Sequence, residues 1–170
     1  MNRNMTGARA KKVTLAIAAA LALTSGMAAR AADNASHTVS FNIAAINEIT
    51  LGAGVTLTVN TATAGSQPNS VSAGSTYSIT TNGTTDSKKI SAKLDSAMPA
   101  NVTLSVNVTA PSNDSISAGA VTLTTSDTEV VGSIEGVAAS AAINYTLSAT
   151  VAAAPAGGSK TVTYTIADDT

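Results

Sequence analysis

The sequence predicts an all-β protein, an antiparallel β-sandwich of eight or nine strands that follows a leader peptide. Apolar residues alternate with serine and threonine over most of the chain after residue 37, and turn-forming residues separate the alternating runs. No window in that region sustains the apolar spacing of three and four that a helix requires. Because successive side chains of a strand point to opposite faces, each run presents one apolar row and one hydroxyl row. Two such one-sided sheets bury their apolar rows by packing face to face, and a closed barrel is the alternative.

Residues 1–31 have the three parts of a cleavable secretory signal peptide. A basic stretch over residues 3–12 precedes an apolar run over residues 13–23, and Ala29 and Ala31 offer small side chains for cleavage after Ala31. The apolar run is shorter than the roughly 20 residues that span a bilayer, so an uncleaved anchor is disfavoured. We therefore expect residues 32–170 to form one mature domain without a membrane span. The signal peptide looks bacterial, so a Sec route to the cell surface or the medium is expected.

Loss of the leader changes the charge of the chain. It removes five basic residues and no acidic one, which leaves four lysines against ten acids, a net charge of −6 and no arginine. A nucleic-acid ligand needs a dense cationic surface, so this class of partner is excluded. The chain has no cysteine, which excludes disulfides and thiolate metal sites.

Eight alternating runs predict the strands in chain order. They cover residues 39–43, 55–59, 77–79, 90–94, 102–108, 121–123, 143–151 and 162–166. Turn residues such as Asn82 and Gly83 lie between the runs. Residues 132–142 are the least strand-like stretch and are expected to form a loop or one helical turn. The three tyrosines, Tyr77, Tyr145 and Tyr164, lie in the apolar rows and are expected in the core.

The pattern of polar residues predicts no enzyme. The single histidine, His37, begins a strand and has no nucleophile or acid that the sequence can place beside it. The acids are scattered, and only Asp127 with Glu129 and Asp168 with Asp169 form local pairs. A solvated surface is favoured over a calcium site there, so no cofactor and no metal are expected.

The predicted strand over residues 90–94 carries lysines, since Lys88 and Lys89 open it and Lys93 lies on its outward face. We interpret these charges as protection of an edge strand against unwanted pairing. A contact with an acidic partner is the alternative.

The first alternating run stands apart because it directly follows the leader. Val39, Phe41, Ile43 and Ala45 form its apolar row, which includes the only phenylalanine of the chain. A strand so placed can pair with its own sheet. It can equally add to the sheet of a neighbouring subunit, where backbone hydrogen bonds supply affinity and alternate side chains fill pockets.

This layout resembles that of bacterial fimbrial (pilin) subunits and of the related spore-coat-U-like secreted domains. The residues that carry the resemblance are Val39-Ser40-Phe41-Asn42-Ile43 after the leader, the short Thr/Ser/Ala-rich strands, and a terminal strand over 161–166. The resemblance implies an incomplete immunoglobulin-like β-sandwich of about seven to nine strands that polymerises by donating an N-terminal strand. Many subunits of the chaperone–usher class have a disulfide, and this chain departs from them in having no cysteine.

The function expected from these observations is that of a structural subunit of an extracellular filament, pilus or cell-surface fibre. Residues 32–45 are the expected donor strand, and the partner is a further copy of the chain in a homopolymer. A host or matrix surface is a possible second partner. The alternative is a secreted monomeric adhesin or carbohydrate-binding module, which would present tyrosines on an open face instead of in the core.

Overall fold

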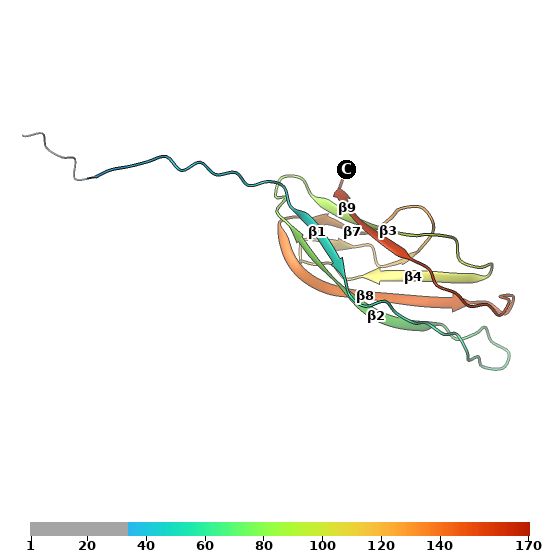
Figure 1. The fold of residues 1–170 in the computed structure, drawn as a ribbon. Coiled ribbons are helices and arrows are strands. Elements are labelled where there is room, and N and C mark those ends of the chain that lie inside the picture. The colour runs from blue at the N-terminus through green and yellow to red at the C-terminus, as the bar shows by residue number, and fades with distance from the viewer. Residues whose placement is uncertain (1–33) are drawn as a thin grey trace, which may run out of the picture. The chain divides into compact units, whose positions relative to one another are not determined.

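A computed structural model describes residues 34–170, so the predicted signal peptide and its cleavage after Ala31 lie outside the described residues. The described part contains nine strands and no helix (Figure 1). The strands are β1 (Asn47–Leu51), β2 (Val71–Thr81), β3 (Lys88–Leu94), β4 (Val102–Val108), β5 (Ile116–Ser117), β6 (Ala120–Thr122), β7 (Thr128–Ile134), β8 (Val137–Ala149) and β9 (Val162–Asp168). The all-β class predicted from the alternation is confirmed.

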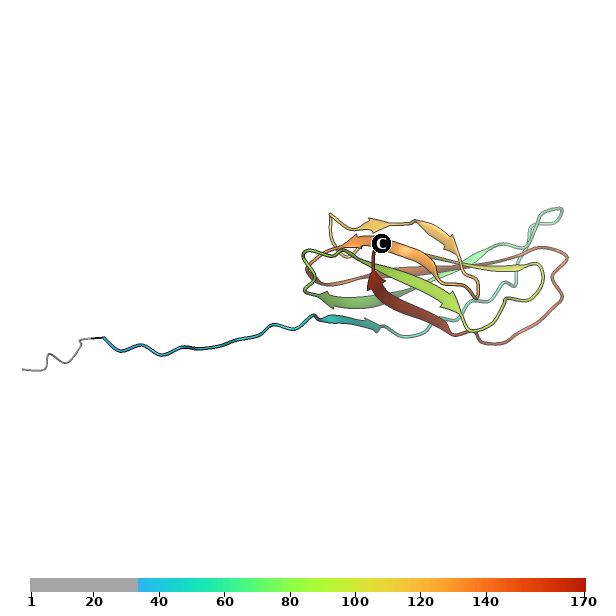
Figure 2. The same ribbon diagram turned by 90° about the horizontal axis from the view of Figure 1, so that it is seen from above.

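The strands form two antiparallel sheets within the compact unit of residues 42–170. The five-stranded sheet has the order β1-β2-β8-β4-β6, and the four-stranded sheet has the order β5-β7-β3-β9. The long strands β2 and β8 pair along residues 71–81 and 137–147 and form the backbone of the larger sheet. Strand β9 ends the smaller sheet and pairs with β3, beside which it lies in Figure 2.

The core lies between the inward rows of the two sheets, as the alternation predicts. In β2 and β4 every second side chain is buried, for example Tyr77, Ile79 and Val106. The facing sheet contributes a matching set of fully buried aliphatic residues, which are Ile90, Ala92, Leu94, Val130, Val131 and Ile134. Each large side chain of this kind stabilises the fold by about 1.5–3 kcal/mol when removed from water.

The expectation for residues 132–142 is wrong. Strand β7 continues to Ile134 and β8 begins at Val137, so only Glu135 and Gly136 connect them. Alanine has a low intrinsic preference for strands, but the long ladder with β2 supplies pairing that overrides it. The alanine-rich segment is therefore a strand because of its partner.

Two predicted strands have no ladder partner in the described part of the chain. Residues 55–59 show the expected alternation of burial, with Val55, Leu57 and Val59 half-buried, but they belong to no strand. Residues 39–43 are likewise outside every strand, and the first strand begins at Asn47. Alternation shows that a segment can form a strand, whereas a strand also needs a neighbour with free backbone groups.

The lysine-bearing strand is not an edge strand, which corrects the interpretation given to its charges. Strand β3 lies between β7 and β9. Its lysines form ion pairs with acids of the adjacent segments: Lys88 with Asp168, Lys89 with Asp169 at 3.8 Å, and Lys93 with Asp127 at 3.0 Å. The lysines therefore help to hold the smaller sheet together.

Candidate functional site

The N-terminal segment, residues 34–46, carries the predicted assembly residues, and all of them are exposed. Val39 is 71 %, Phe41 86 % and Ile43 76 % exposed, and Ala45 is exposed as well. The segment contains no helix and no strand. Large apolar side chains that are exposed at every second position indicate an interaction surface for a further β-sheet or apolar groove.

The end of this segment is held to the body by one residue, Asn82. The Ile46 amide donates to Asn82 Oδ1 at 2.8 Å, and Asn82 Nδ2 donates to the carbonyl of Ala44 at 2.8 Å. The Asn82 amide also donates to the carbonyl of Ile46 at 3.3 Å. The sequence marked Asn82 only as a turn residue, and nothing in the pattern indicates this contact.

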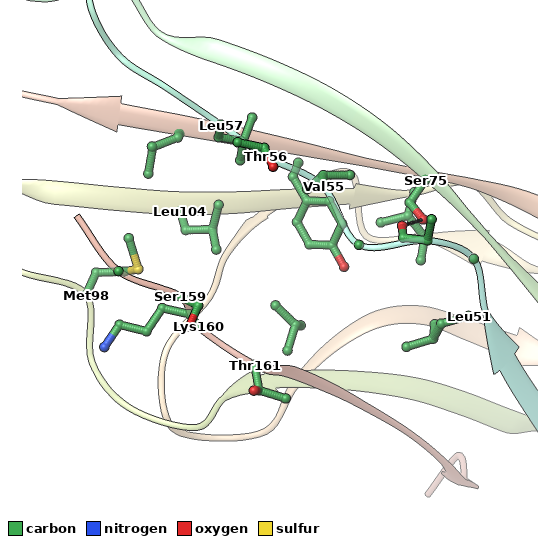
Figure 3. A pocket seen from close by; sticks show the side chains of 18 residues that line it. Leu51, Val55, Thr56, Leu57, Ser75, Met98, Leu104, Ser159, Lys160 and Thr161 are labelled. Carbon is green, nitrogen blue, oxygen red and sulfur yellow. Dashed lines mark hydrogen bonds between the residues drawn. The ribbon is translucent and has the colours of Figure 1, made fainter.

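An apolar hollow of about 550 Å³, which we call the edge groove, opens between the two sheets (Figure 3). Its floor is the inner face of β4 and β8. Residues 51–57 form one wall and residues 158–162 form the other. The floor side chains are Leu104, Ile143, Tyr145 and Leu147. In Figure 3 the labelled residues Val55 and Leu57 lie on one side and Thr161 on the other.

The walls of the edge groove have backbone groups without ladder partners. Residues 54–60 and 155–160 lie in no strand, and neither stretch makes a backbone–backbone hydrogen bond to another described residue. The adjoining strand β9 pairs with β3 on one side only within the described chain. Exposed N–H and C=O groups on extended chain are a template for a further strand.

Tyr145, on the floor of the groove, takes part in a hydrogen bond between the two sheets. The hydroxyls of Tyr145 on β8 and Tyr164 on β9 are 2.8 Å apart. Burial raises the pKa of both tyrosines above the ordinary value, most strongly for Tyr164. Both side chains therefore remain neutral at physiological pH, and their hydroxyl pair ties β9 to the larger sheet.

The tyrosines lie where the apolar rows predicted them. Tyr77 and Tyr164 are buried, and Tyr145 is half-buried. The hydroxyl of Tyr77 donates to the carbonyl of Thr109 at 2.7 Å, and burial raises the pKa of Tyr77 to about 12. These rings pack in the core and at the groove floor, and do not form an open aromatic platform.

The other polar residues singled out from the sequence form no group of metal ligands among residues 34–170, although Glu129 and Asp169 both lie beside Gly132. His37 is exposed in the N-terminal segment. Asp168, Asp169 and Asp127 are occupied by the lysines of β3, and Asp169 also accepts a hydrogen bond from the Ser133 amide at 2.9 Å. Within residues 34–170 no three acidic, histidine or cysteine side chains are grouped as metal ligands would be.

The architecture defines a class, a two-sheet antiparallel β protein with an open groove at one edge. Before its first strand lies an apolar segment that has no ladder partner among residues 34–170. No protein-family model matches the chain, and no curated protein is significantly similar to it in sequence. Among the described residues there is no helix of the length and hydropathy needed to cross a membrane.

Proposed function

We propose that the mature chain is a structural subunit of an extracellular filament or cell-surface fibre, in which the N-terminal segment of one copy completes the sandwich of the next. The observation that carries the proposal is that residues 34–170 include both an apolar strand-like segment without a ladder partner among them and an apolar groove whose walls have stretches without backbone partners among them. The two features are complementary in chemistry and in kind of secondary structure.

The order of the strands supports an immunoglobulin-like sandwich that lacks its last strand. In the immunoglobulin fold, strands A, B, E and D form one sheet and strands C, F and G form the other. Here β1-β2-β8-β4 corresponds to A-B-E-D, and β3 with β9 corresponds to C with F. The free side of β9 is then the position of strand G, while β5, β6 and β7 are an added excursion between D and E.

The spacing of the exposed residues suits a strand that lies over the groove floor. Val39, Phe41 and Ile43 are two residues apart, so in a strand they face the same side and span about 13 Å, at roughly 3.3 Å per residue. Burial of three such side chains contributes on the order of 5–9 kcal/mol before the cost of ordering the segment. Backbone hydrogen bonds along the walls supply the remaining specificity.

The outer face of the larger sheet is suited to a protein exposed in many copies. Its hydroxyls pair across β2 and β8, Ser72 with Thr146 at 2.8 Å and Ser78 with Ser140 at 2.7 Å. Such cross-strand pairs stabilise the sheet from its wet side without adding charge or apolar surface.

The test compares the mature chain, residues 32–170, with a chain that begins at residue 46, by gel filtration and negative-stain microscopy. We expect filaments or a ladder of oligomers from the mature chain and only monomers from the shortened one. A synthetic peptide of residues 34–45 should bind the shortened chain and raise its Tm, whereas a peptide with Phe41→Ala should bind at least tenfold more weakly.

A matched full-length variant removes the risk that the shortened chain does not fold. Phe41→Ala should abolish polymers while the circular dichroism of the body stays unchanged, and Val55→Ala serves as the corresponding change in a groove wall. A mature chain that stays monomeric at high concentration, and a shortened chain that ignores the peptide, would together overturn the proposal.

A further inference from the structure

Beyond the groove, we infer that the carboxamide of Asn82 fixes the point at which the donated strand begins, so that only residues up to Ile43 pass to the neighbour. The inference rests on the proposed function and adds a positioning residue to it. It separates the predicted row into Val39, Phe41 and Ile43, which are free to be donated, and Ala45, which stays with its own subunit.

The Asn82 side chain acts as an extra residue of the β1–β2 ladder. The ladder ends with Asn47 opposite Thr81, and Asn82 is the next residue of that strand. Its carboxamide has a donor and an acceptor in one plane, as a peptide group has. The acceptor takes the Ile46 amide and the donor takes the Ala44 carbonyl, each at 2.8 Å. Residues 44–46 are therefore paired to the body although no strand faces them.

The backbone turns away after Asn82, so beyond the amide of Asn82 the pairing at this corner comes from its side chain. The Gly83 amide donates back to Thr81 Oγ1 at 3.3 Å, and Thr81 Oγ1 donates to Asn47 Oδ1 at 2.8 Å. A Cβ atom on Gly83 would lie only 3.2 Å from the Asp86 carbonyl oxygen, so the turn is tight. The backbone amide of Asn82 still donates to the Ile46 carbonyl at 3.3 Å, and the side chain of Asn82 supplies the bonds to the Ala44 carbonyl and the Ile46 amide.

The large apolar side chain at the clamp is less exposed than the one that precedes the clamp. Ile46 is 44 % exposed, whereas Ile43 is 76 % exposed. A clamp at residues 44–46 leaves no slack between the body and the segment that it donates. Release of these three residues would add up to about 10 Å of chain, at roughly 3.3 Å per residue. The clamp thus determines how far apart successive subunits lie along a filament.

The first measurement is hydrogen exchange of the backbone amides in the mature chain, with Phe41→Ala present in every sample to keep subunits apart. Asn82→Ala should speed exchange of the Ile46 amide at least tenfold and leave the β2–β8 amides unchanged. Asn82→Asp keeps an acceptor for Ile46 but loses the donor to Ala44, so its effect should be intermediate. Asn113→Ala, an exposed asparagine in the loop after β4, is the matched control and should change nothing. Unchanged exchange at Ile46 in Asn82→Ala overturns the inference.

The second measurement is the axial repeat of filaments, with Phe41 intact. Asn82→Ala should lengthen the repeat or broaden its distribution by up to about 10 Å, whereas Asn113→Ala should keep the wild-type repeat. A clamp that merely stabilised the fold would lower the Tm without altering the repeat. Filaments of Asn82→Ala with an unchanged repeat overturn the positioning role and leave the proposed function standing. Absence of filaments from the wild-type chain overturns the proposed function and this inference with it.

Discussion

Two five-residue stretches of this chain have nearly the same sequence pattern, but one forms part of a strand and the other does not. Val39-Ser40-Phe41-Asn42-Ile43 and Val162-Thr163-Tyr164-Thr165-Ile166 both place an aromatic residue between two β-branched ones. The second stretch lies in strand β9, where Tyr164 is 9 % exposed, whereas Phe41 in the first stretch is 86 % exposed. The difference lies in the neighbours, because β9 has the backbone of β3 beside it and the N-terminal segment has none in the described chain. Alternation therefore predicts the ability to pair, and the partner decides the structure.

The largest expected effect tests this comparison at the aromatic position of each stretch. Tyr164→Ala should lower the free energy of unfolding by about 3–5 kcal/mol, because it opens a cavity and removes the hydrogen bond to Tyr145. Phe41→Ala should change it by less than about 0.5 kcal/mol in the monomer. Urea denaturation of monomer fractions measures both values. Equal losses at the two positions would mean that Phe41 packs in its own subunit.

An intermediate effect is expected at high pH, where the buried tyrosines titrate and Phe41 does not. An unfolded tyrosine loses its proton near pH 10.0, but burial raises the pKa of Tyr77 to about 12. Unfolding therefore releases a proton between these values, and the free energy of unfolding falls as pH rises through that window. Each tyrosine contributes a fall of at most about 1.4 kcal/mol per pH unit.

The check is a series of denaturation curves from pH 8 to pH 12, with Tyr77→Phe as the comparison. That variant loses the hydrogen bond to the Thr109 carbonyl and about 1 kcal/mol at neutral pH. Its stability should then fall less steeply above pH 10 than that of the wild type. Parallel curves for the two proteins would show that Tyr77 does not contribute to the alkaline loss.

The smallest expected effect concerns the ion pair at the end of β9. Residues 34–46 of the N-terminal segment have no such pair among the described residues. Asp168→Ala removes the partner of Lys88, but the Asp168 side chain is 70 % exposed and its charge is well screened. The free energy of unfolding should fall by less than about 1 kcal/mol, and by less again in high salt. A loss of several kcal/mol in thermal denaturation would show that the ion pair, and not the ladder with β3, holds this strand.

The sequence allowed the class and most of the core to be predicted, because buried side chains in β2, β3 and β4 keep a strict period of two. Strand β7 was not predicted, because its buried side chains do not keep that period. The β3–β7 ladder shifts register twice, because Lys88 pairs with Ile134, Ile90 with Val131 and Ser91 with Glu129. Strand β7 therefore carries two extra residues, and Ser133 adopts a φ of 54° at the first shift. The second shift skips Val130, and both Val130 and Val131 lie in the core, a pattern that alternation does not describe.

The candidate site could be predicted only in part. The apolar row of the N-terminal segment is visible in the sequence, since its residues are consecutive alternates. The edge groove is not visible, because its walls come from residues 51–57 and 158–162, about a hundred positions apart in the chain. The Asn82 clamp likewise joins residues 36 and 38 positions apart through one side chain. Such contacts follow from the order of strands in space, which a linear pattern does not contain.

The half-buried Tyr145 at the groove floor gives the subunit an optical probe of its own. The chain has no tryptophan and only three tyrosines, so its near-ultraviolet emission comes from Tyr77, Tyr145 and Tyr164 alone. Two of these rings are buried in the folded body, while Tyr145 lines the groove and shares a hydroxyl contact with Tyr164. A strand that enters the groove changes the surroundings of one emitter out of three, and its arrival can be followed in real time without a label.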